Sequence, residues 1–162
     1  MMKHIAILLA FLLTFSSSVV AQDFQKGLAS AQAGDYATAL KEWTPLAEAG
    51  GEVAQYNLGI MYGNGYGVPQ DNAEAVKWYR LAAEQGYAKA QNNLALMYEY
   101  GNGVLQDNTM AHMWYNIASA NGHDKAGEWR DERAGLMTNA DISKAQAMPR
   151  ECMSRGYTKC GY

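Results

Sequence analysis

The sequence predicts an all-α protein, built as a solenoid of stacked helix pairs. Two observations carry this prediction: the chain repeats itself at an offset of 36 residues, and each copy contains two stretches of helical periodicity around a glycine-rich turn. Residues 54–86 align with residues 90–122. The recurring positions that we expect to be structural are Leu58, Tyr62, Gly65, Gly67, Asp71 and Trp78, and their partners Leu94, Tyr98, Gly101, Gly103, Asp107 and Trp114.

Residues 1–21 have the pattern of a cleavable signal peptide. A basic start is followed by an apolar run from Ile5 to Phe15 and by small residues before a predicted cut after Ala21. The apolar run is shorter than the roughly 20 residues that a membrane-spanning helix requires, which disfavours a transmembrane anchor. We therefore expect an exported protein, periplasmic or secreted, with no membrane span in its mature form.

Residues 22–50 are predicted to form an N-terminal helix pair. Phe24, Leu28 and Ala31 fall on one face of its first helix. The second helix would carry Ala39 and Trp43 at the positions that Ala75 and Tyr79 take in the next unit. This pair is therefore an earlier unit with a shorter loop.

Within each full copy the signals for the start and end of helices recur. In the first copy, Ala54 and Leu58 share one face of a helix that stops at the glycine cluster 63–67. Asp71 is the expected N-cap of the second helix, and Glu74 would complete a capping box. Met110 replaces that glutamate in the second copy, so we expect a weaker cap there.

The repeat region is assigned to residues 51–137, with a partial third unit that begins at Ala126. Residues 138–162 are predicted to form a capping helix over 139–155, with Thr138 as N-cap, and a tail. We expect Pro149 to kink or split this helix. In an exported chain, the only two cysteines, Cys152 and Cys160, predict a disulfide that ties the tail to the helix. A redox-active pair is disfavoured because Cys-x-x-Cys spacing is absent.

The first copy contains the pattern Ala-x-x-x-Leu-Gly-x-x-Tyr-x-x-Gly-x-Gly-Val, followed by Asp, Ala, Trp, Ala-Ala and Gly at fixed spacing. This pattern resembles the Sel1-like repeat family, a relative of the tetratricopeptide repeat (TPR). The second copy departs from it at Ala95 and Ser119, both small residues. The resemblance implies a right-handed α-α solenoid of Sel1-like, TPR-like helix pairs that binds proteins. A cysteine-rich branch linked to β-lactam binding has a disulfide in every repeat, and these repeats contain no cysteine.

The sequence offers little chemistry for catalysis, metal binding or nucleic-acid binding. A net charge of −3 gives no excess of cations for phosphates. Neither His112 nor His123 belongs to a metal-binding spacing. The adjacent Asp131 and Glu132 are interpreted as part of a solvated charged face. We expect no cofactor, no metal ion and no catalytic residue.

The first helices of the units are expected to line a concave groove. We expect the groove to be lined by Tyr56, Asn57, Ile60, Asn92, Asn93 and Leu96. In the alternative, Ile60 and Leu96 simply pack against the neighbouring helix. The sequence thus predicts a non-enzymatic adaptor, expected to be monomeric, for a protein or peptide partner. An envelope enzyme acting on peptidoglycan or β-lactams and self-association through residues 126–137 remain alternatives.

Overall fold

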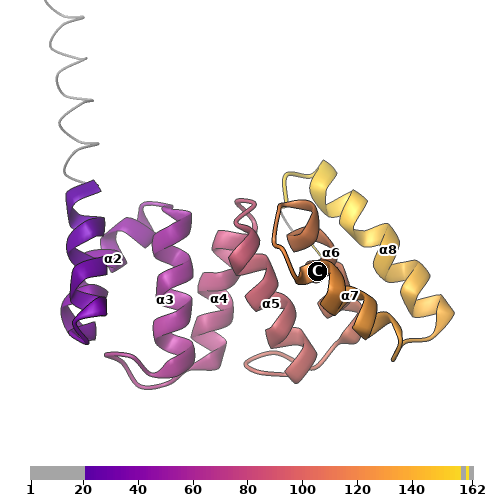
Figure 1. Cartoon of the computed structure of the whole chain (residues 1–162), viewed down its shortest axis with the longest axis horizontal. Helices are drawn as coiled ribbons and strands as arrows, with labels where there is room; N and C mark the ends of the chain where they lie inside the picture. Colours follow the sequence, from indigo (N-terminus) through magenta and orange to yellow (C-terminus); the bar gives the residue numbers. More distant parts are fainter. Residues whose placement is uncertain (1–20, 158–159, 161–162) are drawn as a thin grey trace, which may run out of the picture.

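The structure is a computed structural model, and it describes residues 21–157 and 160. These residues are arranged as antiparallel helices side by side along the long axis of the molecule (Figure 1), with no strand in the described part. The all-α prediction is confirmed. A helix over residues 21–32 is followed by α2 (Tyr36–Glu48), α3 (Glu52–Asn64), α4 (Asn72–Ala83), α5 (Ala88–Tyr100), α6 (Asn108–Ala120), α7 (Ala126–Ala134) and α8 (Asn139–Ser154). The signal peptide predicted for residues 1–21 lies outside the described residues, except for Ala21.

From α2 to α7, each helix packs on the next one along the chain, which is the contact pattern of a solenoid. The last helix departs from this order, because α8 packs chiefly against α6. It runs through Pro149 without interruption, so the predicted split does not occur. A disulfide joins Cys152 of α8 to Cys160 of the tail, and both residues are buried in the same core cluster.

The core is divided between the two ends of the chain. One cluster is centred on Trp43 and Leu58, and the larger one is centred on α6 and its neighbours. Trp114 is fully buried, whereas its counterpart Trp78 is only half-buried. The difference has a physical reason: α6 packs against α8 in addition to its two sequence neighbours, and α4 has no such third helix.

The glycine-rich loops repeat one close contact. Gly67 and Gly103 both have a φ of +73°, which only glycine adopts without strain. A Cβ atom would lie 2.9 Å from the backbone of Tyr36 at Gly67, and 2.3 Å from the backbone oxygen of Asn72 at Gly103. Each loop therefore rests on the first turn of the preceding unit's second helix, and a side chain at either glycine would separate the units.

The N-caps of α4 and α6 differ from expectation. Asp71 accepts a hydrogen bond from the Glu74 backbone N–H at 3.0 Å, but the Asp71 N–H donates to Tyr62 O, so the reciprocal half of a capping box is not formed. Asp107 accepts from the N–H groups of both Thr109 and Met110. The prediction of a weaker second cap is wrong, because Asp107 caps two N–H groups where Asp71 caps one.

Buried glutamines join successive units. Gln55 donates to Ala47 O at 3.0 Å, and its own side-chain oxygen accepts from Gln85 at 2.8 Å. The same arrangement recurs 36 residues later, where Gln91 donates to Ala83 O at 3.0 Å and accepts from Asn121 at 2.9 Å. We call this arrangement the glutamine clamp.

The tail extends the second glutamine clamp by one bond. The hydroxyl of Tyr157 donates to the side-chain oxygen of Asn121 at 2.9 Å. Tyr157 has a φ of 64°, which is unusual for a tyrosine, and its ring lies over Gly86. The tail thus connects the turn after α4 to the turn after α6.

Candidate functional site

A cavity of about 460 Å³ lies between the end of α3 and the middle of α5. We call it the α3–α5 cavity. Its lining contains amides, aromatic rings and apolar side chains but no charged group; the lining residues are Gly63, Asn64, Gln70, Asn72, Tyr79, Asn93, Leu96, Met97, Tyr100 and Asn102. The sequence explains the neutral character, because residues 53–70 contain no charged side chain.

Tyr79 reaches the cavity from α4, where its ring packs closely over Gly59. Burial raises the pKa of Tyr79 to about 12, so the phenol stays protonated at neutral pH. Asn93 hydrogen-bonds to the hydroxyls of both Tyr79 and Tyr56. The Tyr56 ring in turn packs against Tyr87, with 5.2 Å between ring centroids. One wall of the cavity is therefore a fixed, neutral hydrogen-bonding surface.

Two loop amides are oriented by bonds within their own unit. The side-chain NH₂ of Asn64 donates to Ile60 O at 2.8 Å, and that of Gln70 donates to Gly63 O at 2.8 Å. Because each amide uses its NH₂ group internally, its oxygen remains as an acceptor. This arrangement suits a ligand that offers N–H donors.

The equivalent site one unit further along is closed. Its cavity measures about 120 Å³, and there Glu99, Trp129 and Arg133 take the places of Gly63, Asn93 and Met97. Glu99 is only 6% exposed. We call this the α5–α7 site, and its own side chains fill the space that is open at the α3–α5 cavity.

The closure of the α5–α7 site is held by hydrogen bonds and charge. The hydroxyl of Tyr115 donates to a carboxylate oxygen of Glu99 at 2.6 Å, and an Arg133 nitrogen lies 3.5 Å from the other oxygen. Burial, and then the bond to Glu99, hold the pKa of Tyr115 well above its ordinary value. Arg133 supplies the counter-charge that a buried carboxylate requires.

The structure brings together some of the predicted groove residues. Asn93 and Leu96 line the α3–α5 cavity, and Tyr56 borders it through its bond to Asn93. Ile60 and Leu96 also pack against the core, as the alternative interpretation expected.

Two of the predicted groove residues lie elsewhere. Asn57 is half-buried and does not line the cavity. Asn92 is 5% exposed, and its side-chain oxygen has no hydrogen-bond partner among the described residues. Glu99 and Tyr100 escaped the sequence analysis. Glu99 could have been found as a charged residue at the position of a glycine in the aligned copy.

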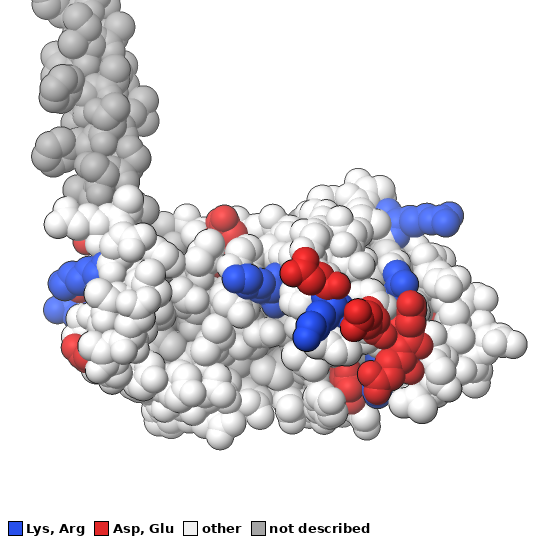
Figure 2. Space-filling view, in the orientation of Figure 1, with Lys and Arg blue, Asp and Glu red and all other residues white. Residues whose placement is uncertain are grey.

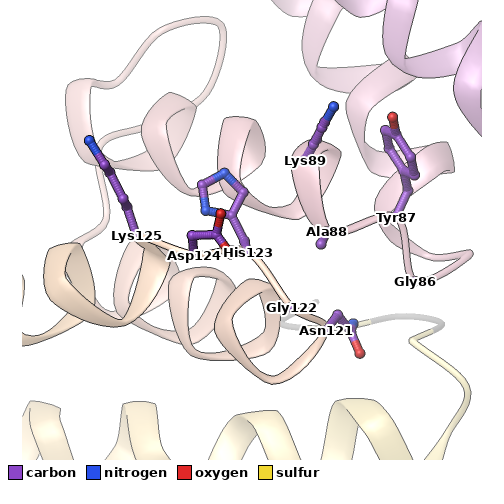
Figure 3. Close-up of a pocket in the computed structure, with 9 residues that line it drawn as sticks. All are labelled: Gly86, Tyr87, Ala88, Lys89, Asn121, Gly122, His123, Asp124 and Lys125. Atoms are coloured by element: carbon purple, nitrogen blue, oxygen red, sulfur yellow. The ribbon is translucent and has the colours of Figure 1, made fainter.

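A second hollow, of about 550 Å³, lies between the two inter-unit turns, residues 86–89 and 121–125. Figure 3 shows His123 between the side chains of Lys89 and Lys125 in that view, with Asp124 beside it. Both lysines are exposed. This hollow is charged and open to solvent, in contrast to the neutral α3–α5 cavity.

A helix pair that reproduces its own caps, loops and joints at a fixed offset defines an α-solenoid repeat protein. The Sel1 repeat family model matches residues 53–87 and 88–123, so this chain contains two Sel1 repeats. The two matched segments contain α3, α4 and α5, which carry residues that line the α3–α5 cavity, and also α6.

Solved structures with the same architecture agree with this assignment. A protective antigen of uropathogenic Escherichia coli strains with an SLR fold shares 26% identity at a TM-score of 0.79, over 86% of this chain and 32% of its own. A Sel1 repeat protein from Oxalobacter formigenes shares 34% identity at a TM-score of 0.63, over 66% of this chain and 44% of its own. This chain therefore spans less than half the length of either protein. A search of curated proteins found no match.

Proposed function

We propose that this protein is a non-enzymatic adaptor that binds a peptide segment of a partner protein in the α3–α5 cavity. The observation that carries the proposal is a preformed cavity of about 460 Å³ lined by amides and apolar side chains, with its closed counterpart one unit away. Side-chain amides match the N–H and C=O groups of an extended backbone, while Leu96 and Met97 offer apolar contact. Sel1 repeats favour a protein partner.

The chemistry of the lining supports binding over turnover. The most perturbed group, Tyr79, stays protonated at neutral pH and is unsuited to act as a base. The cavity lining contains no serine, cysteine, histidine or carboxylate. Turnover of peptidoglycan or β-lactam by the purified protein would overturn the non-enzymatic part of the proposal.

We place the adaptor outside the cytoplasm, periplasmic or secreted, as a monomer. The signal-peptide pattern and the disulfide between Cys152 and Cys160 support export, since disulfides persist in oxidising compartments. Within the described residues, no helix is both long enough and apolar enough to cross a bilayer. N-terminal sequencing of the protein from fractionated cells should give Gln22 as the first residue, and an intact Met1 in the cytoplasmic fraction would contradict export.

The binding activity is tested with a displayed library of random dodecapeptides selected against the purified protein. Peptides should be enriched, and isothermal titration should give one peptide per chain. Light scattering against concentration should report a monomer. If no peptide is enriched over an unrelated protein, the peptide-binding function is wrong.

A further inference from the structure

We infer that this protein binds its peptide in a single register: an uncharged stretch with an apolar side chain enters the α3–α5 cavity and packs against Tyr100, while Glu99 and Arg133 exclude it from the α5–α7 site. The inference rests on the proposed function and adds to it the register and the chemistry of the bound segment.

The α3–α5 cavity is open, whereas the equivalent α5–α7 site is closed. At Gly63 a Cβ atom would meet Ala75 at 3.6 Å and Tyr79 at 3.9 Å, both ordinary contacts. Packing therefore does not demand a glycine there, and the missing side chain leaves usable space. At the equivalent position, Glu99 fills that space and accepts the hydroxyl of Tyr115. A peptide that followed the stack would meet this buried carboxylate.

The lining of the α3–α5 cavity determines which charge its occupant can have. No charged side chain lines the α3–α5 cavity, and residues 53–70 contain none. A charged group that entered would lose its hydration without gaining a partner. On the face shown in Figure 2, acidic side chains gather over α7, and the surface over α3 is largely uncharged. The bound segment is therefore neutral, and charged residues lie outside it.

Tyr100 lines both sites, and its side chain is 63% exposed. Its hydroxyl hydrogen-bonds to Glu99, and that bond raises the pKa of Tyr100. Because Arg133 and Tyr115 hold Glu99, its carboxylate is an anchored partner for the exposed Tyr100. A tyrosine restrained in this way loses less entropy on binding, and tyrosine is common among the residues that dominate binding energy.

A peptide fits this surface better than a neutral oligosaccharide. Both could hydrogen-bond to amides, but Leu96, Met97 and the Tyr100 ring form apolar walls. A peptide supplies a backbone for the amides and an apolar side chain for these walls, whereas a sugar would bury hydroxyl groups against them.

The register is tested with the peptides selected from the dodecapeptide library. We expect them to share an uncharged core that contains an apolar residue. The double variant Gly63→Glu/Met97→Arg copies the closed site beside Tyr79 and should abolish binding. Tyr100→Ala should weaken binding by about tenfold or more. The matched control is Leu105→Ala, because Leu105 is 90% exposed and lines none of the cavities described above.

The link between Glu99 and Tyr100 is tested by two substitutions at residue 99. Glu99→Gln keeps an oxygen for the Tyr100 hydroxyl, and Glu99→Ala removes it. Affinity at the α3–α5 cavity should be largely retained by Glu99→Gln and weakened by Glu99→Ala, by no more than Tyr100→Ala weakens it, when both are compared at temperatures well below their melting points. Equal affinity of the two variants would show that Glu99 does not contribute to binding through Tyr100.

The outcomes separate the register from the general function. If the selected peptides bind folded Gly63→Glu/Met97→Arg as tightly as the original protein, or if Tyr100→Ala binds unchanged, the register is wrong while peptide binding stands. A charged residue shared by the cores of the selected peptides would also show that the register is wrong while peptide binding stands. Should only a neutral oligosaccharide array bind, and no peptide, both proposals fail. Circular dichroism shows whether the double variant is folded. If the double variant does not fold, Tyr100→Ala alone tests the role of the cavity.

Discussion

The glutamine clamp provides the most direct test of whether the two units are physically equivalent. Gln55 and Gln91 are 4% and 0% exposed, and each makes two side-chain hydrogen bonds to a neighbouring helix end. Replacing either by methionine keeps the length of the side chain and removes both bonds. We expect Gln55→Met and Gln91→Met to destabilise the protein by the same amount.

The magnitude follows from what each partner loses. The carbonyls of Ala47 and Ala83 still accept hydrogen bonds from the N–H groups of Gly50 and Gly86, both at 3.0 Å. Neither carbonyl is therefore left without a hydrogen bond. Gln85 and Asn121, on the other side, are accessible enough for water to replace the lost bond. The cost is therefore near two ordinary hydrogen bonds, about 2 kcal/mol, without the larger penalty for orphaned groups. In a chain of this size that lowers Tm by about 4–8 °C.

Urea unfolding followed by far-UV circular dichroism measures the free energies, with Gln146→Met as control. Gln146 is exposed on α8, so its replacement should change stability by less than about 0.5 kcal/mol. Losses below that level at Gln55 or Gln91 would mean that the bonds do not form. A difference of more than about 1 kcal/mol between the two variants would refute the equivalence of the units.

Three further predictions concern stability. Burial lowers the pKa of His112 from 6.5, so His112 takes up a proton in the unfolded chain before it does so in the folded protein as the pH falls. The free energy of unfolding should therefore decrease by at most about 1.4 kcal/mol per pH unit between 6.5 and the lower pKa of the folded state. Melting curves of His112→Gln over the same pH range should lack this loss. Gly103→Ala, with a clash at 2.3 Å, should cost about 3 kcal/mol or more in urea unfolding, against about 1 kcal/mol for Gly34→Ala, which has φ +81° and no neighbour within 4 Å. Removing the disulfide, which spans 8 positions, by Cys152→Ala/Cys160→Ala should cost about 2.5 kcal/mol, and an unchanged midpoint would show that the tail contributes nothing.

The helices were predictable because their signals are local. Asp71 and Asp107 mark the starts of α4 and α6, and the glycines after α3 and α5 mark the ends of those helices, so these boundaries fall at matching positions in the two copies. The split predicted at Pro149 does not occur, because α8 continues through this residue while it packs along α6.

The candidate site was only partly predictable, because its shape depends on residues from adjacent units. A helical wheel of α5 alone places Asn92 on the groove face, yet the helices around α5 bury it. Matching positions between the copies identified the fold, whereas the positions that fail to match identified the site. Gly63 against Glu99, and Met97 against Arg133, are the differences that decide which cavity is open.

The hydrogen bond from Tyr157 to Asn121 has a consequence for how the inter-unit turns respond to reducing conditions. Tyr157 also contacts Gly86, so the tail joins the turn at residues 86–89 to the turn at residues 121–125. Because the disulfide holds this tail to α8, reducing the disulfide should loosen both turns as well as the tail itself.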